Sequence, residues 1–352
     1  PMPDAWLHSA LDAAATALGT ELFVVKGVFA VLLVCLLCGA VGAMVVGNRM
    51  AFFSDAMAHS AFAGVALGYL AVLAAGAAQN TTAVAWTVPL VMVAFGAAVG
   101  VAMVFVRERT GLTNDTVIGV FFALAIGFGA MLFRVLQQKA RFDPEAFLFG
   151  SLLFVPEVNL VYLIGLLALV AGLFAARFND LAFASFSPSL ARTRRVGLRA
   201  NNYLFIVLLA LVVNLSIQAV GALLINALLV VPAAAAANVA RNLRQMFWLT
   251  LAFCVGSGLL GFYLSTSVTL PIGTGVKFAP SGTIVVVCVG VFFATVALTG
   301  RRSGPAGAPC AWGCASSARP LPASPRPDLP GGRAGAGRGI QPGQRAARGH
   351  PT

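Results

Sequence analysis

Long apolar runs, separated by short polar segments, fill the first 300 residues of the chain. An α-helix needs about 18 apolar residues to cross a bilayer core roughly 30 Å thick. A run at 53–75 meets this length, and so do six others, at 22–46, 83–106, 115–136, 157–176, 243–265 and 281–299. The pattern therefore predicts an all-α protein whose helices span a membrane.

The apolar run at 203–237 is too long for one perpendicular crossing. We expect it to divide into a span that ends near Gln218 and a second helix that begins at Gly221 and closes near Pro232 or shortly after. The resulting prediction is a polytopic transmembrane helical bundle of nine helices. Eight crossings with one re-entrant segment are the alternative.

Composition agrees with lipid as the solvent of this chain. Hydrophobic residues make up 59% of the 352 residues and charged residues only 10%, with a mean hydropathy of +0.91. Soluble domains carry about a quarter charged residues. Residues 1–21 have no basic region of the kind that opens a signal peptide, so we predict an extracytoplasmic N-terminal segment there and a transmembrane domain at 22–300.

The segment 301–352 differs from the rest of the chain. It carries eight Arg and one Asp, and so supplies +7 of the formal net charge of +12. It is rich in Pro, Gly and Ala, which predicts a disordered tail. Its charge suits weak attraction to acidic membrane lipid, although a tail without a specific role is the simpler interpretation. Aromatic residues are not interleaved with its arginines apart from Trp312, so no nucleic-acid partner is expected.

Basic residues in short loops predict the orientation of the spans. Arg49, Arg107 and Arg109, the arginine-rich loop at 177–202, and Arg241 with Arg244 alternate with poorly charged loops at 76–82 and 266–280. Placing the basic loops in the cytoplasm puts the N-terminus outside and the C-terminus inside, with Lys139 and Arg141 as the exception. The predicted location is a bacterial cytoplasmic (inner) membrane.

The stretch RMAFFSDAMAHSAFAGVALG, from Arg49 to Gly68, places two ionisable residues inside a predicted span. Asp55 and His59 are four residues apart, so they share a helix face with Cβ atoms about 6 Å apart. Gly64 lies about 180° around the helix from Asp55 at 100° per residue. Gly64 and Gly68 form a GxxxG pair typical of close helix packing. The predicted helix therefore has one polar face, with Asp55 and His59, and an opposite face suited to close helix packing.

Ionisable side chains inside a span usually mark a pathway. A carboxylate and an imidazole together suit a borderline divalent cation, and a proton relay or a hydrogen-bonded structural pair are the alternatives. Asn214, Gln218 and Asn226 are further pathway candidates, or hydrogen-bonding links between helices. Cys35 and Cys38 form a CxxC within the first span, where we interpret them as small packing residues.

These residues resemble a known family, the membrane permeases of ATP-binding-cassette importers for zinc, manganese and iron. The stretch at 49–68 is similar to that family's R-M-x-x-x-x-D-x-x-x-H-x-x-x-x-G-x-x-x-G signature. Two further blocks agree in order and spacing, DPEAFLFGSLL at 143–153 and VGALLINALLVVPAAAA at 220–236. The likeness covers roughly residues 22–300.

The resemblance implies a transport permease that is not itself an enzyme. It implies that Asp55 and His59 contact the transported Zn²⁺ or Mn²⁺, with Fe²⁺ as a further option, and that no cofactor is bound permanently. The implied partners are a second permease copy or a close relative, a pair of cytoplasmic ATP-binding subunits and an extracytoplasmic metal-binding protein. The chain contains no G-x-x-x-x-G-K-[ST] motif, so ATP must be hydrolysed by a separate subunit.

The resemblance also places an ATPase-coupling helix in the loop at 177–202. Ser187 and Pro188 are typical of a helix start, and the coupling candidates are Pro188, Leu190, Ala191, Arg192, Arg194 and Arg195. Here the chain departs from the family, because Ser189 stands where relatives usually have an acidic residue. Arg194 and Arg195 replace a small or acidic residue and a glycine. The tail at 301–352 is also foreign to the family.

Three other classes of membrane protein are alternatives to a metal-importer permease. An ion- or proton-coupled secondary carrier that uses Asp55 and His59 as a relay would work without an ATPase. A membrane metalloprotease would need a second histidine at HExxH-like spacing, which the chain lacks. A vitamin or siderophore permease would lack the Asp-x-x-x-His block.

Overall fold

The computed structural model of the 352-residue chain describes residues 5–19, 21–48, 50–76, 81–137, 150, 152, 155–186, 198–270 and 276–300. The tail expected to be disordered, the coupling candidates between 188 and 195, most of the block at 143–153, and Arg49 lie outside these ranges. The helical domain described here belongs to the compact unit Pro1–Gly304.

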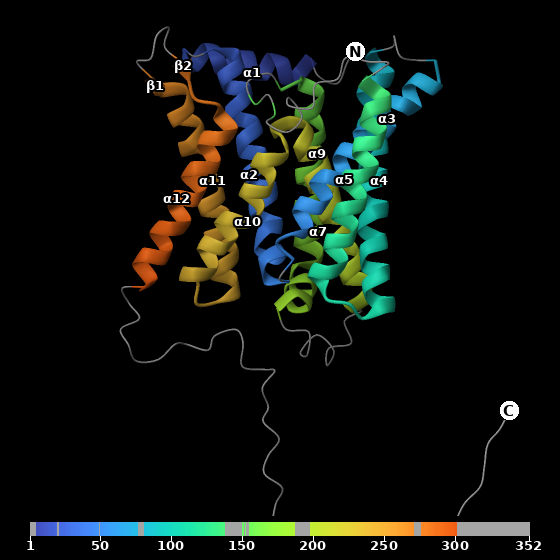
Figure 1. Ribbon diagram of the computed structural model, residues 1–352. Helices are drawn as coiled ribbons and strands as arrows, with labels where there is room; N and C mark the ends of the chain where they lie inside the picture. Colours follow the sequence, from blue (N-terminus) through green and yellow to red (C-terminus); the bar gives the residue numbers. More distant parts are fainter. Residues whose placement is uncertain are drawn as a thin grey trace, which may run out of the picture. The chain divides into compact units, whose positions relative to one another are not determined.

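Helices make up nearly all of the described structure (Figure 1). One short helix precedes nine helices that are each long and apolar enough to cross a membrane, as predicted. The helices are α1 (Ala5–Leu18), α2 (Leu22–Gly47), α3 (Phe53–Ala74), α4 (Thr81–Thr110), α5 (Asn114–Gln137), α7 (Glu157–Phe186), α9 (Leu198–Val220), α10 (Ala222–Val239), α11 (Leu243–Ser267) and α12 (Pro280–Gly300).

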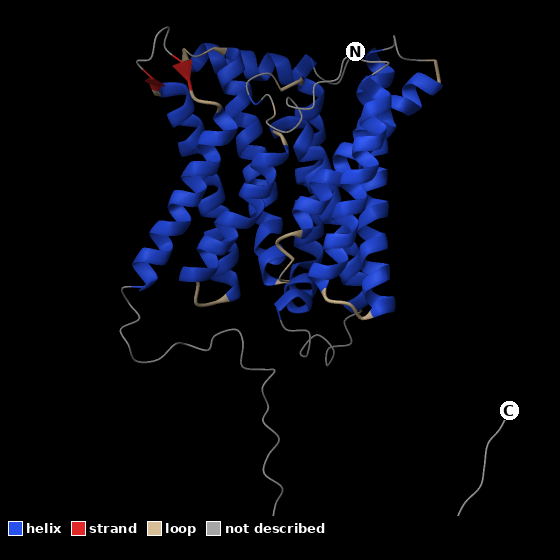
Figure 2. Cartoon of the chain, viewed as in Figure 1, coloured by secondary structure: helices blue, strands red, loops and turns tan. Residues whose placement is uncertain are grey.

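Two features at one end of the bundle were not predicted. The helix α1 lies across the ends of the spans, and the strands β1 (Thr269–Leu270) and β2 (Val276–Lys277) pair antiparallel at the same end (Figure 2). The nine-crossing topology puts the N-terminal segment and the loop at 266–280 on the same, extracytoplasmic side. The shared position of α1 and the strand pair therefore agrees with that topology.

Three helix boundaries differ from those expected by five residues or more. The helix α7 continues ten residues beyond 176 to Phe186, and α9 begins at Leu198 rather than 203, so both enter the range expected to be the loop 177–202. The helix α10 was expected to close near Pro232 or shortly after, and it runs seven residues past the proline to Val239. Apolar run length marks the lipid-facing part of a helix, but backbone hydrogen bonding continues wherever propensity permits.

Each proline inside a span has its lost hydrogen bond replaced by another helix. Pro232 has no N–H for the carbonyl of Leu228, and the thiol of Cys254 on α11 donates to that oxygen at 3.6 Å. Pro89 in α4 likewise frees the carbonyl of Ala85, which accepts the Tyr162 hydroxyl of α7 at 3.4 Å. Membrane helices tolerate proline when neighbours satisfy the freed backbone in this way.

The junction between α9 and α10 depends on two glycines. Gly221 joins the helices with φ 88° and ψ 158°, a conformation that side chains disfavour. Gly150, with φ 69°, lies directly against the backbone of Val220 and Gly221, where a Cβ would have no room. Because the chain reverses direction within one residue, α10 starts next to the end of α9. This turn therefore sets the position of the first turns of α10.

The predicted close-packing face of α3 is confirmed. A Cβ built on Gly64 would lie 2.9 Å from Cα of Met92, and one built on Gly68 would lie 2.9 Å from Cα of Val88. Both contacts are with α4, so the two glycines let these backbones approach closely. The opposite face of α3 is thereby left to its polar residues.

Candidate functional site

Asp55 and His59 lie on one face of α3, close to where that helix begins. The helix starts at Phe53, so Asp55 occupies its first turn. The N–H groups of a first turn have no partners within the helix and favour a negative charge. A carboxylate is therefore favourably placed in this first turn.

The two side chains face each other without a hydrogen bond. Oδ1 of Asp55 and Nε2 of His59 are 4.0 Å apart, longer than a hydrogen bond allows. With metal–ligand bonds of about 2.1 Å, neighbouring ligands lie about 3.0–3.4 Å apart. If the two atoms moved about 0.6–1.0 Å closer together, one cation could contact both at these bond lengths.

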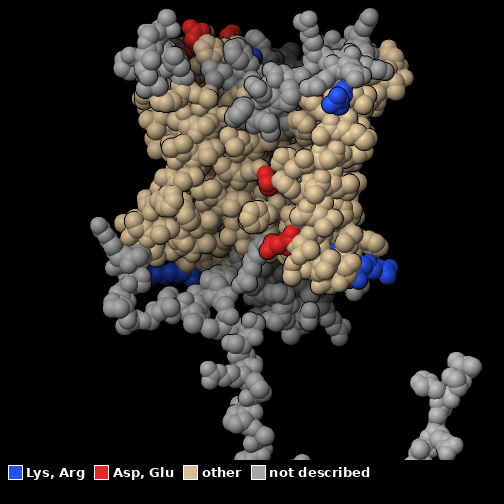
Figure 3. Space-filling model, in the orientation of Figure 1, with Lys and Arg blue, Asp and Glu red and all other residues tan. Residues whose placement is uncertain are grey.

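Neither side chain is sealed inside the bundle. The side chains of Asp55 and His59 are 44% and 35% exposed. Figure 3 shows one acidic area at mid-height and another below it on a face that is otherwise largely uncharged, with basic side chains near its ends. A charge exposed at this depth calls for water, an ion or another protein chain beside it, because lipid solvates it poorly.

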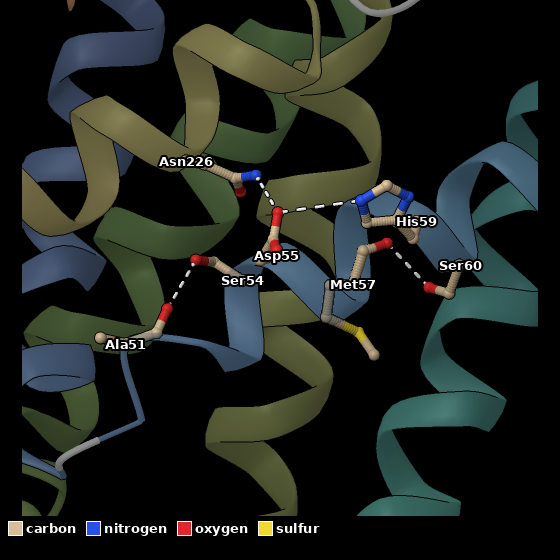
Figure 4. A network of polar contacts seen from close by, with 7 residues as sticks. All are labelled: Ala51, Ser54, Asp55, Met57, His59, Ser60 and Asn226. Carbon is tan, nitrogen blue, oxygen red and sulfur yellow. Dashed lines mark hydrogen bonds and ion pairs between the residues drawn. The ribbon is translucent and has the colours of Figure 1, made fainter. Parts of the chain in front are cut away.

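Asn226 of α10 completes the polar network (Figure 4). Its amide nitrogen donates to Oδ1 of Asp55 at 2.8 Å, and no other hydrogen bond to this carboxylate is found in the described part of the chain. The amide oxygen of Asn226 is buried and has no partner among the described residues. Of the three pathway candidates, Asn226 is the one that the fold brings to Asp55.

The other two amides make their contacts elsewhere. Asn214 is fully buried, donates to the carbonyl of Ala210 in its own helix at 2.6 Å, and packs against Gly96 of α4. Gln218 donates to the sulfur of Met92, also on α4, at 3.7 Å. Both residues therefore link α9 and α4 rather than joining the Asp55–His59 pair.

An aromatic residue also contacts the imidazole of His59. The ring of Phe122, on α5, meets His59 edge to face with centroids 4.8 Å apart. Sequence reasoning missed Phe122, because a phenylalanine in an apolar span carries no local mark of such a contact.

One chain by itself offers an incomplete coordination shell. The described residues contain no cluster of three or more His, Cys, Asp or Glu side chains that could hold a metal ion. Asp55 and His59 supply two donors, with the Asn226 amide adjacent, so an ion here would need further ligands from water or from another chain. Such an open set suits transient contact better than permanent retention.

A family model matches most of the chain. Residues 21–299 match the model described as the ABC 3 transport family. The zinc uptake system membrane protein ZnuB of Haemophilus influenzae is 30% identical over 231 residues, which are 65% of this chain and 83% of that protein. The manganese import system permease protein ScaB of Streptococcus gordonii is 27% identical over 254 residues, 72% of this chain and 86% of the relative.

A solved structure shares the fold. A chain of PsaBC from Streptococcus pneumoniae, solved in complex with Fab, superimposes with a TM-score of 0.64 at 24% sequence identity. The match covers 82% of this chain and 94% of the other. The arrangement of spans is therefore one already seen in a membrane protein.

Proposed function

The chain belongs to the ABC 3 transport family of metal-importer permeases, and from this premise we propose that Asp55 and His59 contact a divalent transition-metal ion as it enters the cytoplasm. As a permease of this class, the protein crosses the membrane several times and depends on a separate ATPase and a solute-binding partner. The membership removes the alternative of a secondary carrier that works without ATP.

The observation that carries the proposal is the open geometry of the pair. Asp55 and His59 lie on one helix face, 4.0 Å apart and partly exposed within a span. A carboxylate at this depth costs several kcal/mol unless it has a partner, and Asn226 satisfies only part of its hydrogen-bonding capacity. A cation that sheds water onto the carboxylate and the imidazole supplies the missing partner.

The proposed assembly contains a second permease copy. The exposed edge of Asp55 and His59 cannot face lipid without cost, and a second chain across the path would cover it. The second chain would also contribute its own ligands, completing a shell that one chain leaves open. The apolar outer faces of the spans would contact membrane lipid, and no nucleic acid takes part.

We propose Zn²⁺ or Mn²⁺ as the transported ion, with Fe²⁺ as a further option. Imidazole suits Zn²⁺ and carboxylate suits both Mn²⁺ and Zn²⁺, so the two donors alone accommodate each ion. Import also requires release, which a closed cage of four strong ligands would prevent. ATP-driven movement of the segment containing Pro188, Leu190, Ala191, Arg192, Arg194 and Arg195 would open the site inward.

Uptake of radiolabelled Mn²⁺ and Zn²⁺ tests this function in liposomes that contain the complete importer. We expect His59→Ala to abolish uptake while the complex still elutes at its normal size. Ser60→Ala is the matched control, because Ser60 is the next residue on α3 and, among the described residues, its hydroxyl bonds only to the carbonyl of Met57. Near-normal uptake by the His59→Ala importer would refute the proposed role.

A further inference from the structure

Asn226 is bonded to the pair through one end of its amide only. Its nitrogen donates to Oδ1 of Asp55, while its oxygen is buried without a partner in the described structure. An ionised carboxylate can only accept hydrogen bonds, so the nitrogen end must be the one that faces Asp55. Asn214 also has a buried amide oxygen without a partner in the described structure, so what distinguishes Asn226 is that its donor end meets the Asp55 carboxylate.

The carboxylate oxygen that accepts the Asn226 amide is also the one that faces His59. Oδ1 of Asp55 accepts the amide at 2.8 Å and stands 4.0 Å from Nε2 of His59 (Figure 4). Side chains four residues apart on a helix are within reach of each other. Without the hydrogen bond from Asn226 on α10, the carboxylate could rotate toward the imidazole of His59 and form a direct hydrogen bond with it. The space between the two side chains would then be lost.

We propose that Asn226 is a positioning residue of the cation site, which holds the Asp55 carboxylate on the α10 side and keeps the Asp55–His59 pair open. The inference rests on the proposed function of that pair. Outer partners that orient a metal ligand typically change metal affinity by about 10–100-fold when removed. The fold supplies the geometry, because the turn at Gly221 brings Asn226, in the second turn of α10, to the start of α3.

Two substitutions separate positioning from packing. Asn226→Leu keeps a branched side chain but removes the donor, whereas Asn226→Ser keeps an O–H donor but removes volume. If Asn226 acts by hydrogen bonding to Asp55, metal affinity falls in the order wild type, Ser, Leu. If it acts only by filling space, the order of the two variants reverses.

The matched control is Asn238, on the same helix. Its amide also donates between helices, to Oγ1 of Thr295 on α12 at 3.5 Å, but it lies twelve residues further along α10. Asn238→Leu therefore removes an interhelical amide bond without touching the site. It is expected to leave the metal concentration for half-maximal uptake unchanged.

The experiment measures the Mn²⁺ and Zn²⁺ concentrations that give half-maximal uptake by the reconstituted importer. We expect Asn226→Leu to raise this concentration about tenfold and Asn226→Ser to raise it less. Unchanged values for Asn226→Leu, or a greater loss for Ser than for Leu, would overturn the positioning role. Should the Leu variant not assemble, the Ser variant compared with Asn238→Ser decides, since equal half-saturation values would also overturn it.

Asp55→Asn and His59→Ala, measured in the same series, distinguish a failure of the role proposed for Asn226 from a failure of the function proposed for the Asp55–His59 pair. If both lose uptake while Asn226→Leu transports normally, only the role of Asn226 fails. If both transport normally, the function proposed for the pair fails instead.

Discussion

The rings of His59 and Phe122 meet nearly at right angles, with an interplanar angle of 86° and centroids 4.8 Å apart. An edge-to-face contact of this kind is worth about 0.5–1.5 kcal/mol beyond simple burial. It joins α5 to the polar face of α3 and restricts the orientation of the imidazole. The histidine is thus oriented by an aromatic ring on α5, while the aspartate is hydrogen-bonded to Asn226 on α10.

Phe122→Ala should weaken metal uptake without abolishing it. Loss of the ring frees His59 to take other rotamers, so we expect the half-saturating metal concentration to rise several-fold, consistent with about 1 kcal/mol of lost orientation. Phe121→Ala is the control, because Phe121 is also half-buried but points about 100° away around α5. Equal effects of the two variants would indicate general loosening of α5 rather than a specific contact with His59.

Cys254→Ala should destabilise the protein through the carbonyl of Leu228. That oxygen loses its helical partner to Pro232 and accepts the thiol of Cys254 instead. We expect a loss of about 1 kcal/mol in the free energy of unfolding, measured by thermal denaturation in detergent, with uptake affinity unchanged. The loss should be smaller in a Pro232→Ala background, where a backbone N–H is restored. Equal losses in both backgrounds would show that the thiol bond contributes nothing.

Gly150→Ala should prevent correct assembly. A residue other than glycine at φ 69° costs about 1–2 kcal/mol, and here the new Cβ would also collide with the backbone of Val220. Gly111→Ala provides the comparison, since Gly111 has φ 66° but open space around the added Cβ. Yields of monodisperse protein after purification check the prediction, and an intact Gly150→Ala protein would contradict the tight junction between Gly150 and the α9–α10 turn.

Charge reversal at Arg194 and Arg195 should uncouple ATP hydrolysis from transport. The arginines lie in the segment expected to contact the ATPase, far along the chain from Asp55 and His59, so metal binding should persist. The ratio of metal imported to ATP hydrolysed is the quantity to measure, and we expect it to fall several-fold. Arg244→Glu, at an exposed position at the start of α11, is the comparison. A loss of metal affinity before any loss of coupling would contradict this assignment.

The sequence by itself predicted an all-α membrane protein with eight or nine spans and the two faces of α3, and the structure decided for nine candidate spans in the described residues. Both are local properties, because the length of an apolar run decides whether a helix can cross the bilayer and the 3.6-residue period decides which residues share a face. Asp55 with His59, and Gly64 with Gly68, could therefore be placed from spacing alone. The extents of α7 and α10 could not, because backbone hydrogen bonds continue past the apolar run and past Pro232.

Only the tertiary structure decided which side chains from other helices meet that face. Asn226 is 171 positions from Asp55 in the chain, and Asn214 and Gln218 carried the same sequence signal yet turned toward α4. Phe122 and Cys254 gave no signal at all, since an aromatic ring or a thiol in an apolar span is an ordinary packing residue. Contacts between helices depend on their axial register and rotation, and here those were set by close glycine packing and by the one-residue turn at Gly221.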